Sequence, residues 1–298
     1  FTSTRCLLRC MPRPRSIGAL VCSMVERERM MLVTDPGQSK PEGWTRFVCF
    51  SDTHGLHHKI PPEHQPEADV LLHAGDFTNS GELSQVKSFA QWLKEYPVKE
   101  KVVIAGNHDL SFDEDYCKTR LKKTSMCIEA KTILQGSCRY LEDESVEVFG
   151  YRIYGSPWQP EFCDWAFNLP RGEALAKVWA NIPEQLDILM THGPAYGILD
   201  QCQSGLRAGC EDLLKAIRKR SVQVHLSGHI HEGYGYEEVG KTCFMNASTC
   251  TFFYRPTNPP LLFDLPPAEK LRKYPVEVPT VVPTVSEKME SKEILSAP

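Results

Sequence analysis

Short apolar runs rich in β-branched residues recur between residue 46 and residue 264, and most of them end in a polar loop. Runs of about four to eight such residues are typical of buried strands. The ranges expected to be strands are 47–50, 68–74, 101–105, 132–134, 146–154 (one strand or two), 186–190, 222–227, 242–245 and 261–263.

Helical periodicity fills the segments between several of these runs. Residues 82–96 place Leu83, Val86 and Phe89 on one face, and Pro97 ends the helix because it lacks a backbone N–H. Further helices are expected over 173–182 and 210–219, and a mixture of helix and loop over 110–140. From residue 46 the order is strand, strand, helix, strand, which predicts an α/β fold.

The chain of 298 residues is long enough for one large domain or two small ones. We expect one folded domain over 45–265, a disordered or mis-assigned leader over 1–44 and a disordered, proline-rich tail over 266–298. The first 24 residues contain four arginines and no acidic residue, which resembles a mitochondrial transit segment. The alternative is a leader without a targeting role, with translation starting at a later methionine.

The amino-acid composition argues against several classes of protein. A net charge of −4 gives no general attraction to nucleic acid or anionic lipid, and no run approaches the roughly 18 apolar residues of a membrane span. The 12 cysteines include no Cys-x-x-Cys pair, which argues against a disulfide framework and against a cysteine-ligated zinc site. We therefore expect an intracellular, cytoplasmic protein, with the mitochondrion as the alternative if the leader is a targeting signal.

Five of the expected strands end in loops that carry metal-ligand or acid–base side chains. The most concentrated loop is Gly106-Asn107-His108-Asp109, directly after the run 101–105. The other four loops contribute Asp52 and His54, Asp76, His192, and His229 with His231. Taken singly, each loop is equally well explained as a polar turn, or the last as half of a zinc site. Because carboxyl ends of parallel strands meet on one rim of a sheet, the five together predict convergence on a metal site.

The chemistry of these side chains suits two cations. A pair of divalent ions about 3.5–4 Å apart can stabilise the attacking and leaving oxygens of a phosphoryl displacement. Such a pair needs a bridging carboxylate to screen the repulsion between the metals, and mixed nitrogen and oxygen ligands suit manganese, iron or zinc. A hydroxide between the metals is available near neutral pH, and histidine is suited to protonating the departing alkoxide.

The order of these motifs is similar to that of the calcineurin-like metallophosphoesterases, over residues 46 to about 264. The stretches 50–54, 75–78, 231–235 and 258–266 resemble, more narrowly, the small metallophosphoesterase-domain-containing proteins of types 1 and 2. The resemblance implies a single-domain α/β fold, a two-sheet β-sandwich flanked by helices.

The resemblance also implies a role for each residue. Asp52, His54 and His231 would hold the first metal, Asp76 would bridge, and Asn107, His192 and His229 would hold the second. His108 would be the proton donor to the leaving oxygen, and Asp109 the carboxylate that orients and charges it. Some members of the subgroup carry Gly where His229 stands. This chain retains the histidine, so we expect a competent two-metal centre.

We expect a dinuclear metal-dependent phosphodiesterase that uses a metal-bridged hydroxide on cyclic nucleotides or similar small phosphodiesters. The expected cofactors are two divalent ions, manganese first, with iron or zinc as alternatives. The expected partner is a small phosphoester or nucleotide, without a membrane or nucleic-acid partner. A phosphomonoesterase or protein phosphatase uses the same core, and a low-activity interaction scaffold with this fold is a further alternative.

The remaining candidates receive structural interpretations. His57, His58 and His64 are expected to be exposed, and His73 and His225 to be core residues. Arg171 and Arg207 are candidate phosphate contacts. A core role is expected for the aromatic residues of the segment 158–167, namely Trp158, Phe162, Trp165 and Phe167.

Overall fold

The computed structural model describes residues 29–273, and two six-stranded sheets lie at its centre. Sheet 1 has the strand order β1-β14-β2-β3-β4-β5 and sheet 2 the order β12-β13-β11-β10-β7-β6. The strands of sheet 1 are β1 (Met31–Leu32), β2 (Thr45–Phe50), β3 (Val70–His73), β4 (Glu100–Ile104), β5 (Arg139–Leu141) and β14 (Leu261–Leu265). Those of sheet 2 are β6 (Glu144–Val148), β7 (Tyr151–Ser156), β10 (Ile188–Thr191), β11 (Val224–Ser227), β12 (Gly235–Val239) and β13 (Thr242–Asn246).

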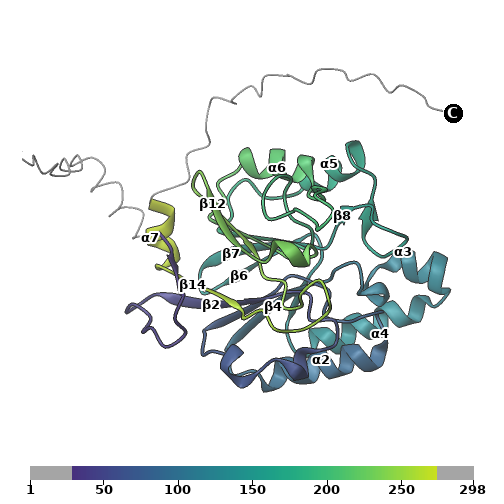
Figure 1. Cartoon of the computed structure of the whole chain (residues 1–298), viewed down its shortest axis with the longest axis horizontal. Helices are drawn as coiled ribbons and strands as arrows, with labels where there is room; N and C mark the ends of the chain where they lie inside the picture. Colours follow the sequence, from purple (N-terminus) through teal and green to yellow (C-terminus); the bar gives the residue numbers. More distant parts are fainter. Residues whose placement is uncertain (1–28, 274–298) are drawn as a thin grey trace, which may run out of the picture.

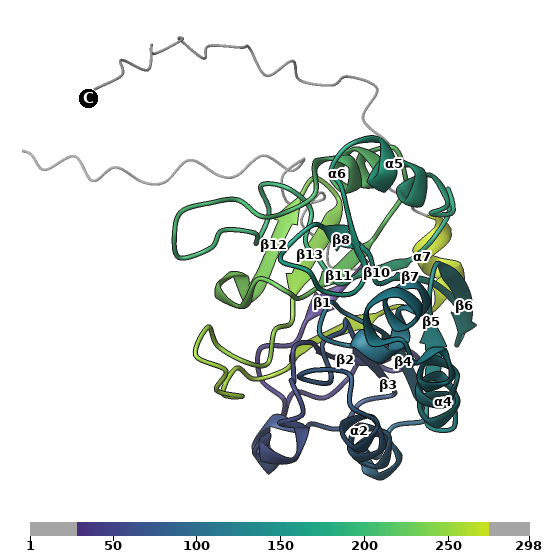
Figure 2. The same cartoon turned by 90° about the vertical axis from the view of Figure 1, so that its right-hand side faces the viewer.

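Helices cover the outer face of each sheet, so the molecule has four layers. Helices α2 (Leu83–Glu95) and α4 (Thr124–Gln135) lie against sheet 1, and α5 (Glu173–Ala180) and α6 (Glu211–Arg218) against sheet 2 (Figures 1 and 2). The inner faces of the two sheets pack on each other through alternating strand residues, Phe47 and Val70 from one sheet and Ile188 and Val224 from the other. The chain therefore has the two-sheet sandwich flanked by helices that its motifs predict.

Within each sheet the central strands are parallel. β2, β3, β4 and β5 run in one direction in sheet 1, and β7, β10, β11 and β13 in one direction in sheet 2. Strands β14, β12 and β6 pair antiparallel with their neighbours. An isolated bridge between Ser51 and Ser248 joins the two sheets where their parallel strands end. The carboxyl ends of both sets of strands therefore meet at one place.

Short helices and a small two-stranded sheet complete the part of the chain between residues 29 and 273. Four 3₁₀ turns are η1 (His57–Lys59), η2 (Pro62–His64), η3 (Leu110–Phe112) and η5 (His231–Gly233), and η4 (Cys117–Leu121) is a π-helix. The other elements are α3 (Glu114–Tyr116), α7 (Ala268–Lys273) and the pair β8 (Gln159–Pro160) and β9 (Asn168–Leu169). No helix among the residues described here combines the length and the apolar character needed to cross a bilayer.

The structure corrects the sequence interpretation in three places. Residues 132–134 are not a strand: they belong to α4, whose buried residues Cys127, Ala130 and Leu134 form a helical face. β1 lies within the expected leader and pairs with β14. α7 lies within the expected tail, and its Leu271 is buried in the core. The arginine-rich segment and residues 274–298 lie outside the described residues.

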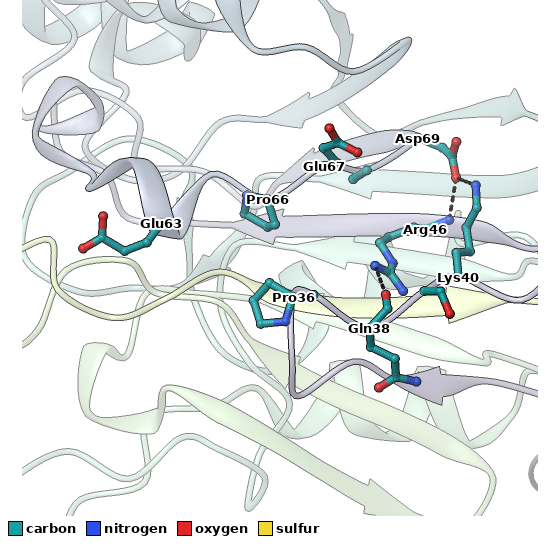
Figure 3. A pocket seen from close by; sticks show the side chains of 11 residues that line it. Pro36, Gln38, Lys40, Arg46, Glu63, Pro66, Glu67 and Asp69 are labelled. Carbon is teal, nitrogen blue, oxygen red and sulfur yellow. Dashed lines mark hydrogen bonds and ion pairs between the residues drawn. The ribbon is translucent and has the colours of Figure 1, made fainter.

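The ends of the strands remote from the polar loops carry a separate polar cluster. A cavity of about 600 Å³ lies there. Within it Lys40 pairs with Asp69, and the backbone N–H of Arg46 donates to the same carboxylate at 2.8 Å (Figure 3). The Arg46 guanidinium also forms a buried ion pair with Asp264 at 2.8 Å. These contacts tie the segment before β2 to sheet 1.

Candidate metal centre

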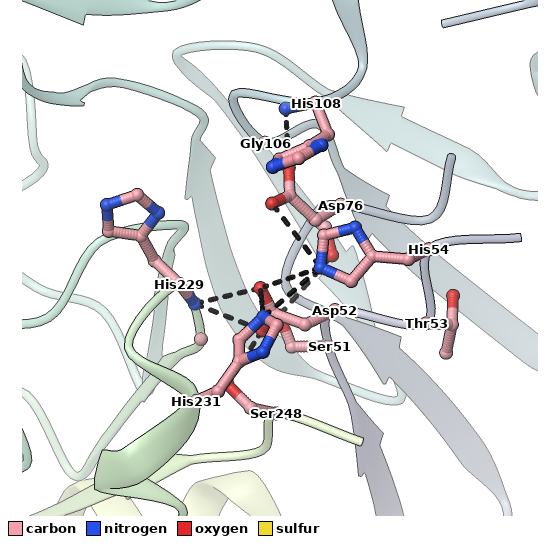
Figure 4. A network of polar contacts seen from close by, with 12 residues as sticks. Ser51, Asp52, Thr53, His54, Asp76, Gly106, His108, His229, His231 and Ser248 are labelled. Atoms are coloured by element: carbon pink, nitrogen blue, oxygen red, sulfur yellow. Dashed lines mark hydrogen bonds and ion pairs between the residues drawn. The ribbon is translucent and has the colours of Figure 1, made fainter. Parts of the chain in front are cut away.

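Loops from both sheets converge on one site. Asp52 and His54 follow β2, Asp76 follows β3, and Asn107 follows β4, whereas His192 follows β10 and His229 and His231 follow β11. Parallel pairing places the carboxyl ends of these strands side by side, so the seven side chains predicted as metal ligands lie together. Figure 4 shows five of them, Asp52, His54, Asp76, His229 and His231. The structure thus brings together the residues that the sequence analysis singled out, and their role as metal ligands stays a prediction.

Four of these residues have a left-handed backbone. The φ angles are 51° at Asp52, 45° at His54, 55° at Asp76 and 66° at His229. This region costs an L-residue roughly 1–2 kcal/mol. Such strain clusters at functional sites, where the surrounding structure holds it in place. Here the turn at each strand end directs the side chain into the space between the sheets.

The first cluster consists of Asp52, His54 and His231, whose ligand atoms lie within 4.8 Å of one another. Nε2 of His54 is 3.1 Å from Nε2 of His231, and Nε2 of His231 is 3.5 Å from Oδ1 of Asp52. Figure 4 shows the three side chains pointing toward one another.

The second cluster consists of Asp76, His192 and His229. Nε2 of His192 lies 3.3 Å from Oδ2 of Asp76 and 3.0 Å from Oδ1 of Asn107. Oδ2 of Asp76 is also 3.9 Å from Nε2 of His54, in the first cluster. Asp76 therefore lies between the two clusters, the position required of a bridging carboxylate.

Backbone carbonyls set the tautomers of two of the histidines. Nδ1 of His192 donates to the Ala74 carbonyl at 2.9 Å, and Nδ1 of His231 donates to that of Thr251 at 3.0 Å. A carbonyl only accepts, so in each ring Nε2 is left for a metal.

Charge balance within the site moves several pKa values. Burial lowers the pKa of His54 to about 4 and that of His229 to about 3, so both rings are neutral and able to bind a cation near pH 7. Burial also opposes a charge on His192, but the Asp76 carboxylate outweighs it and raises the pKa of His192 to about 9. Against the same penalty of burial, His231 and the other imidazoles hold the pKa of Asp52 well below its usual range.

Glycines allow the loops to approach this closely. A Cβ added at Gly228 would lie 2.0 Å from Oγ of Ser51 and 2.1 Å from Oδ2 of Asp52. At Gly106 it would lie 2.3 Å from Oδ1 of Asp76. Only glycine fits at either position, because the obstacle is a metal-ligand side chain or its neighbour.

His108 lies at the edge of the clusters, half-buried, with a ligand atom within 4.8 Å of those of His54 and Asp76. Its Nδ1 donates to the backbone carbonyl of Asn79 at 2.9 Å. This placement fits the predicted proton donor, with the other ring nitrogen available to a substrate.

Asp109 does not have the contacts that the resemblance implied. Its buried carboxylate accepts from the N–H groups of Asp76, Thr78 and Gly106 at 2.9 Å and from Oγ1 of Thr78 at 2.7 Å. The Asn79 carbonyl, not Asp109, is the recorded partner of the His108 ring. Burial and the nearby Asp76 raise the pKa of Asp109 to about 7. Asp109 thus holds together the loops that carry Asp76 and Asn107.

Three of the other histidines are buried in the core. His73 and His225 are buried and contact the hydroxyls of Thr53 and Thr191, as predicted for core residues. His57 corrects the sequence interpretation, because its side chain is buried against α2 and contacts Oγ of Ser88 at 3.0 Å.

Neither candidate phosphate-binding arginine is seen at the ligand clusters. Arg207 pairs with Asp200 at 2.7 Å, and Arg171 donates to the carbonyls of Ala208 and Gly209. These contacts stabilise the loop after β10.

Three aromatic rings stand at the mouth of the site, one of which the sequence analysis overlooked. The ring centroid of Trp165 lies 4.2 Å from that of His108. Phe162 is 57% exposed, and its ring centroid lies 5.8 Å from that of His229. The prediction of a core role was wrong for the exposed Phe162 and the half-buried Trp165, and correct for the buried Phe167 and for Trp158, which packs against the core. Tyr254, which no motif indicated, lies 4.7 Å from His54 and 5.3 Å from His231.

The donor set fits divalent cations. Four imidazoles, two carboxylates and an amide oxygen converge, with Nε2 fixed as the free nitrogen in His192 and His231. Such mixed nitrogen and oxygen ligands are typical of manganese, iron and zinc sites. The arrangement therefore defines a candidate divalent metal centre.

Comparison with known proteins gives the class to which this fold and site belong. The family model described as "Calcineurin-like phosphoesterase" matches residues 31–233, and the chain belongs to this family. The protein is 47% identical over 240 residues to the human "Metallophosphoesterase domain-containing protein 1", covering 76% of this chain and 73% of the relative. The family is one of phosphoester hydrolases, in agreement with the site.

The chain is also similar to proteins of lower sequence identity. A Synechococcus protein named "Probable cyclic nucleotide phosphodiesterase" is 25% identical over 201 residues, covering 65% of this chain and 70% of its own length. A solved crystal structure with 16% sequence identity superposes with a TM-score of 0.51, over 68% of this chain and 90% of the other. This last likeness supports the fold alone.

Proposed function

We propose that this protein hydrolyses small phosphodiesters, cyclic nucleotides among them, at a pair of divalent metal ions. The observation that carries the proposal is the position of Asp76. Its Oδ2 lies 3.9 Å from Nε2 of His54 and 3.3 Å from Nε2 of His192. One carboxylate shared by two ligand clusters is the arrangement that a two-metal phosphoesterase requires.

The chain offers a ligand set for each ion. Asp52, His54 and His231 would hold one, Asn107, His192 and His229 the other, and Asp76 both. Manganese is the expected metal, with iron or zinc as alternatives. When bound, such ions neutralise charge on the phosphoryl oxygens and lower the pKa of water.

His108 supplies the proton that the leaving oxygen needs. Its Nδ1 is engaged by the Asn79 carbonyl, so Nε2 is the nitrogen that delivers the proton. The rings of Trp165 and His54, 4.2 Å and 4.6 Å from that of His108, restrict its movement. Proton donation of this kind contributes about 10²- to 10⁴-fold to a rate.

The aromatic rings at the mouth favour a substrate with a flat group. Trp165 and Phe162 come from the loop between β8 and β9, and Tyr254 from the loop before β14. Stacking on such rings contributes about 1–3 kcal/mol per nucleic-acid base. A cyclic nucleotide combines a phosphodiester with a base of this kind. The name of the Synechococcus relative supports the same choice of substrate.

Two alternatives use the same fold. A phosphomonoesterase or protein phosphatase would need the same metal core and differ in its surrounding loops. An interaction scaffold without chemistry would not require metal ligands, and the presence of all seven predicted ligand residues in the sequence supports the enzyme instead. We therefore place hydrolysis first.

We also propose that the protein acts on soluble substrates in the cytoplasm. All nine cysteines among the described residues are free thiols, which suits a reducing compartment. Cell fractionation of the full-length chain, beside one that lacks residues 1–24, tests this against a mitochondrial location.

The experiment that tests the function compares two chromogenic substrates with added Mn²⁺. Bis-p-nitrophenyl phosphate reports diester cleavage and p-nitrophenyl phosphate reports monoester cleavage, with Asp76→Ala as the control without the shared ligand. Diester cleavage that disappears in the control supports the proposal. A preference for the monoester moves the assignment to a phosphatase, and two bound metals without turnover on either substrate favour the scaffold.

A further inference from the structure

We infer that Gln85 on α2 is a positioning residue for His108 and acts through the backbone carbonyl of Asn79. The inference rests on the proposed function, because it concerns the group that protonates the leaving oxygen. The contacts form a short chain from a helix to the imidazole.

The first contact fixes the tautomer of the imidazole. His108 Nδ1 and the Asn79 carbonyl oxygen are 2.9 Å apart, and a carbonyl oxygen can only accept. Nδ1 must therefore carry a hydrogen, which leaves Nε2 as the nitrogen that exchanges a proton with the substrate. A shift of the carbonyl would release the ring and allow the other tautomer.

The second contact holds that carbonyl in place. The backbone N–H of Asn79 donates to Oε1 of Gln85 at 2.9 Å, and that of Ser80 to the same oxygen at 3.4 Å. The side chain of Asn79 is exposed, so it is not what anchors the segment. One amide oxygen on a helix thus fixes two successive peptide groups of the turn that holds His108.

The position of Asp109 makes this anchor important. An imidazole next to a carboxylate would be oriented by an ion pair, but Asp109 accepts from the backbone of the neighbouring loops instead. The neighbouring rings restrict the movement of the His108 ring, but its tautomer depends on a neutral backbone acceptor, whose position depends on the turn that contains Asn79.

Four variants separate a loss of positioning from general damage to the fold. Gln85→Met keeps the length of the side chain and removes the acceptor oxygen, and Gln85→Glu retains an oxygen for the two N–H groups. Gln91→Ala is the matched control, because Gln91 lies on the same helix and its amide donates to Glu95 at 2.8 Å. His108→Gln marks complete loss of the donor.

The kinetic experiment compares methyl p-nitrophenyl phosphate with methyl phenyl phosphate. p-Nitrophenolate leaves without a proton, whereas the more basic phenolate benefits from protonation. For Gln85→Met we expect turnover of the phenyl ester to fall about 10- to 100-fold, and turnover of the nitrophenyl ester to change less than about twofold. Gln85→Glu and Gln91→Ala should behave as wild type. An equal loss on both esters, or no loss, overturns the inference.

A second readout does not depend on turnover. In protein labelled with ¹⁵N-histidine and kept metal-free, ring nitrogen shifts report the tautomer, and the signal of His108 is the one missing in His108→Gln. We expect hydrogen on Nδ1 in wild type and Gln85→Glu, and a shift toward hydrogen on Nε2 in Gln85→Met. An unchanged tautomer in Gln85→Met overturns the inference. Absence of turnover in wild type counts against the proposed function alone, because the tautomer can still be read.

Discussion

His192 and Asp76 come from different sheets, yet Nε2 of His192 lies 3.3 Å from Oδ2 of Asp76. Both side chains are almost completely buried, and Nδ1 of His192 donates to the Ala74 carbonyl at the end of β3. The carboxylate raises the pKa of His192 to about 9, against the effect of burial. A cation that enters this position therefore replaces a proton, and the metal centre forms only when the two sheets are correctly packed.

Asp76→Asn should reduce metal binding without unfolding the protein. The amide keeps the size of the side chain but removes the negative charge shared by the two clusters, so we expect fewer than two metals per chain and a fall in turnover of more than about 100-fold. Elemental analysis after dialysis measures the metals, and circular dichroism measures the fold. The exposed Asp115→Asn is the control. Two metals retained by Asp76→Asn would contradict the bridging role.

Asp109→Asn should mainly lower stability. The buried carboxylate accepts from three backbone N–H groups and one hydroxyl, and an amide NH₂ in place of one oxygen leaves at least one of these donors without an acceptor. We expect the free energy of unfolding in urea to fall by about 1–3 kcal/mol. If Asp109 instead charged His108, stability would be nearly unchanged and the loss would be in kcat.

The sequence pattern predicted the elements that hold the ligands because local rules suffice for them. The strands before the predicted ligands are apolar runs followed by polar loops, namely β2, β3, β4, β10 and β11. Parallel pairing of these strands then brings the loops at their carboxyl ends together. Local rules failed at residues 132–134, where a β-branched run reads as a strand. There the packing of Ala130 and Leu134 against the rest of the core stabilises α4 instead.

Contacts between distant segments could not be predicted in the same way. Strand β12 is exposed and carries two adjacent glutamates, so only its pairing with β13 makes it a strand. The partner of the His108 ring is a backbone carbonyl, which has no signature in sequence. Tyr254 contacts the ring of His54 because of the conformation of the loop between β13 and β14, and no sequence motif marks this residue.

Gly228→Ala should damage the first metal position. The new Cβ would lie 2.0 Å from Oγ of Ser51 and 2.1 Å from Oδ2 of Asp52, so either β11 or the loop after β2 must move. We expect a loss of about 1–3 kcal/mol in the free energy of unfolding and weaker metal binding. Calorimetric titration with Mn²⁺ and urea unfolding measure the two effects. Gly136→Ala is the control, because its Cβ would come no closer than 3.4 Å to another atom. Equal behaviour of the two variants would mean that Gly228 is not constrained.

His57 should make the protein less stable in mild acid. Burial, helped by the nearby His58, lowers the pKa of His57 to about 4, whereas an unfolded histidine titrates near 6.5. Between these values the unfolded chain binds a proton that the folded chain excludes, so the stability conferred by the neutral ring is present above about pH 6.5 and lost as the pH falls toward 4. The slope contributed by one such group is at most about 1.4 kcal/mol per pH unit.

His57→Gln removes this titration and keeps a polar side chain at the position facing Ser88. We expect its free energy of unfolding in urea to fall less than that of wild type between pH 7 and pH 5. His58→Gln is the matched control, since His58 is exposed and its substitution keeps the buried ring of His57 and the burial that is the larger cause of its lowered pKa. Identical pH dependence in wild type and His57→Gln would show that the buried imidazole does not exclude the proton, and any acid sensitivity of the fold would then come from other groups, among them His73 and His225, whose pKa values burial lowers to about 3.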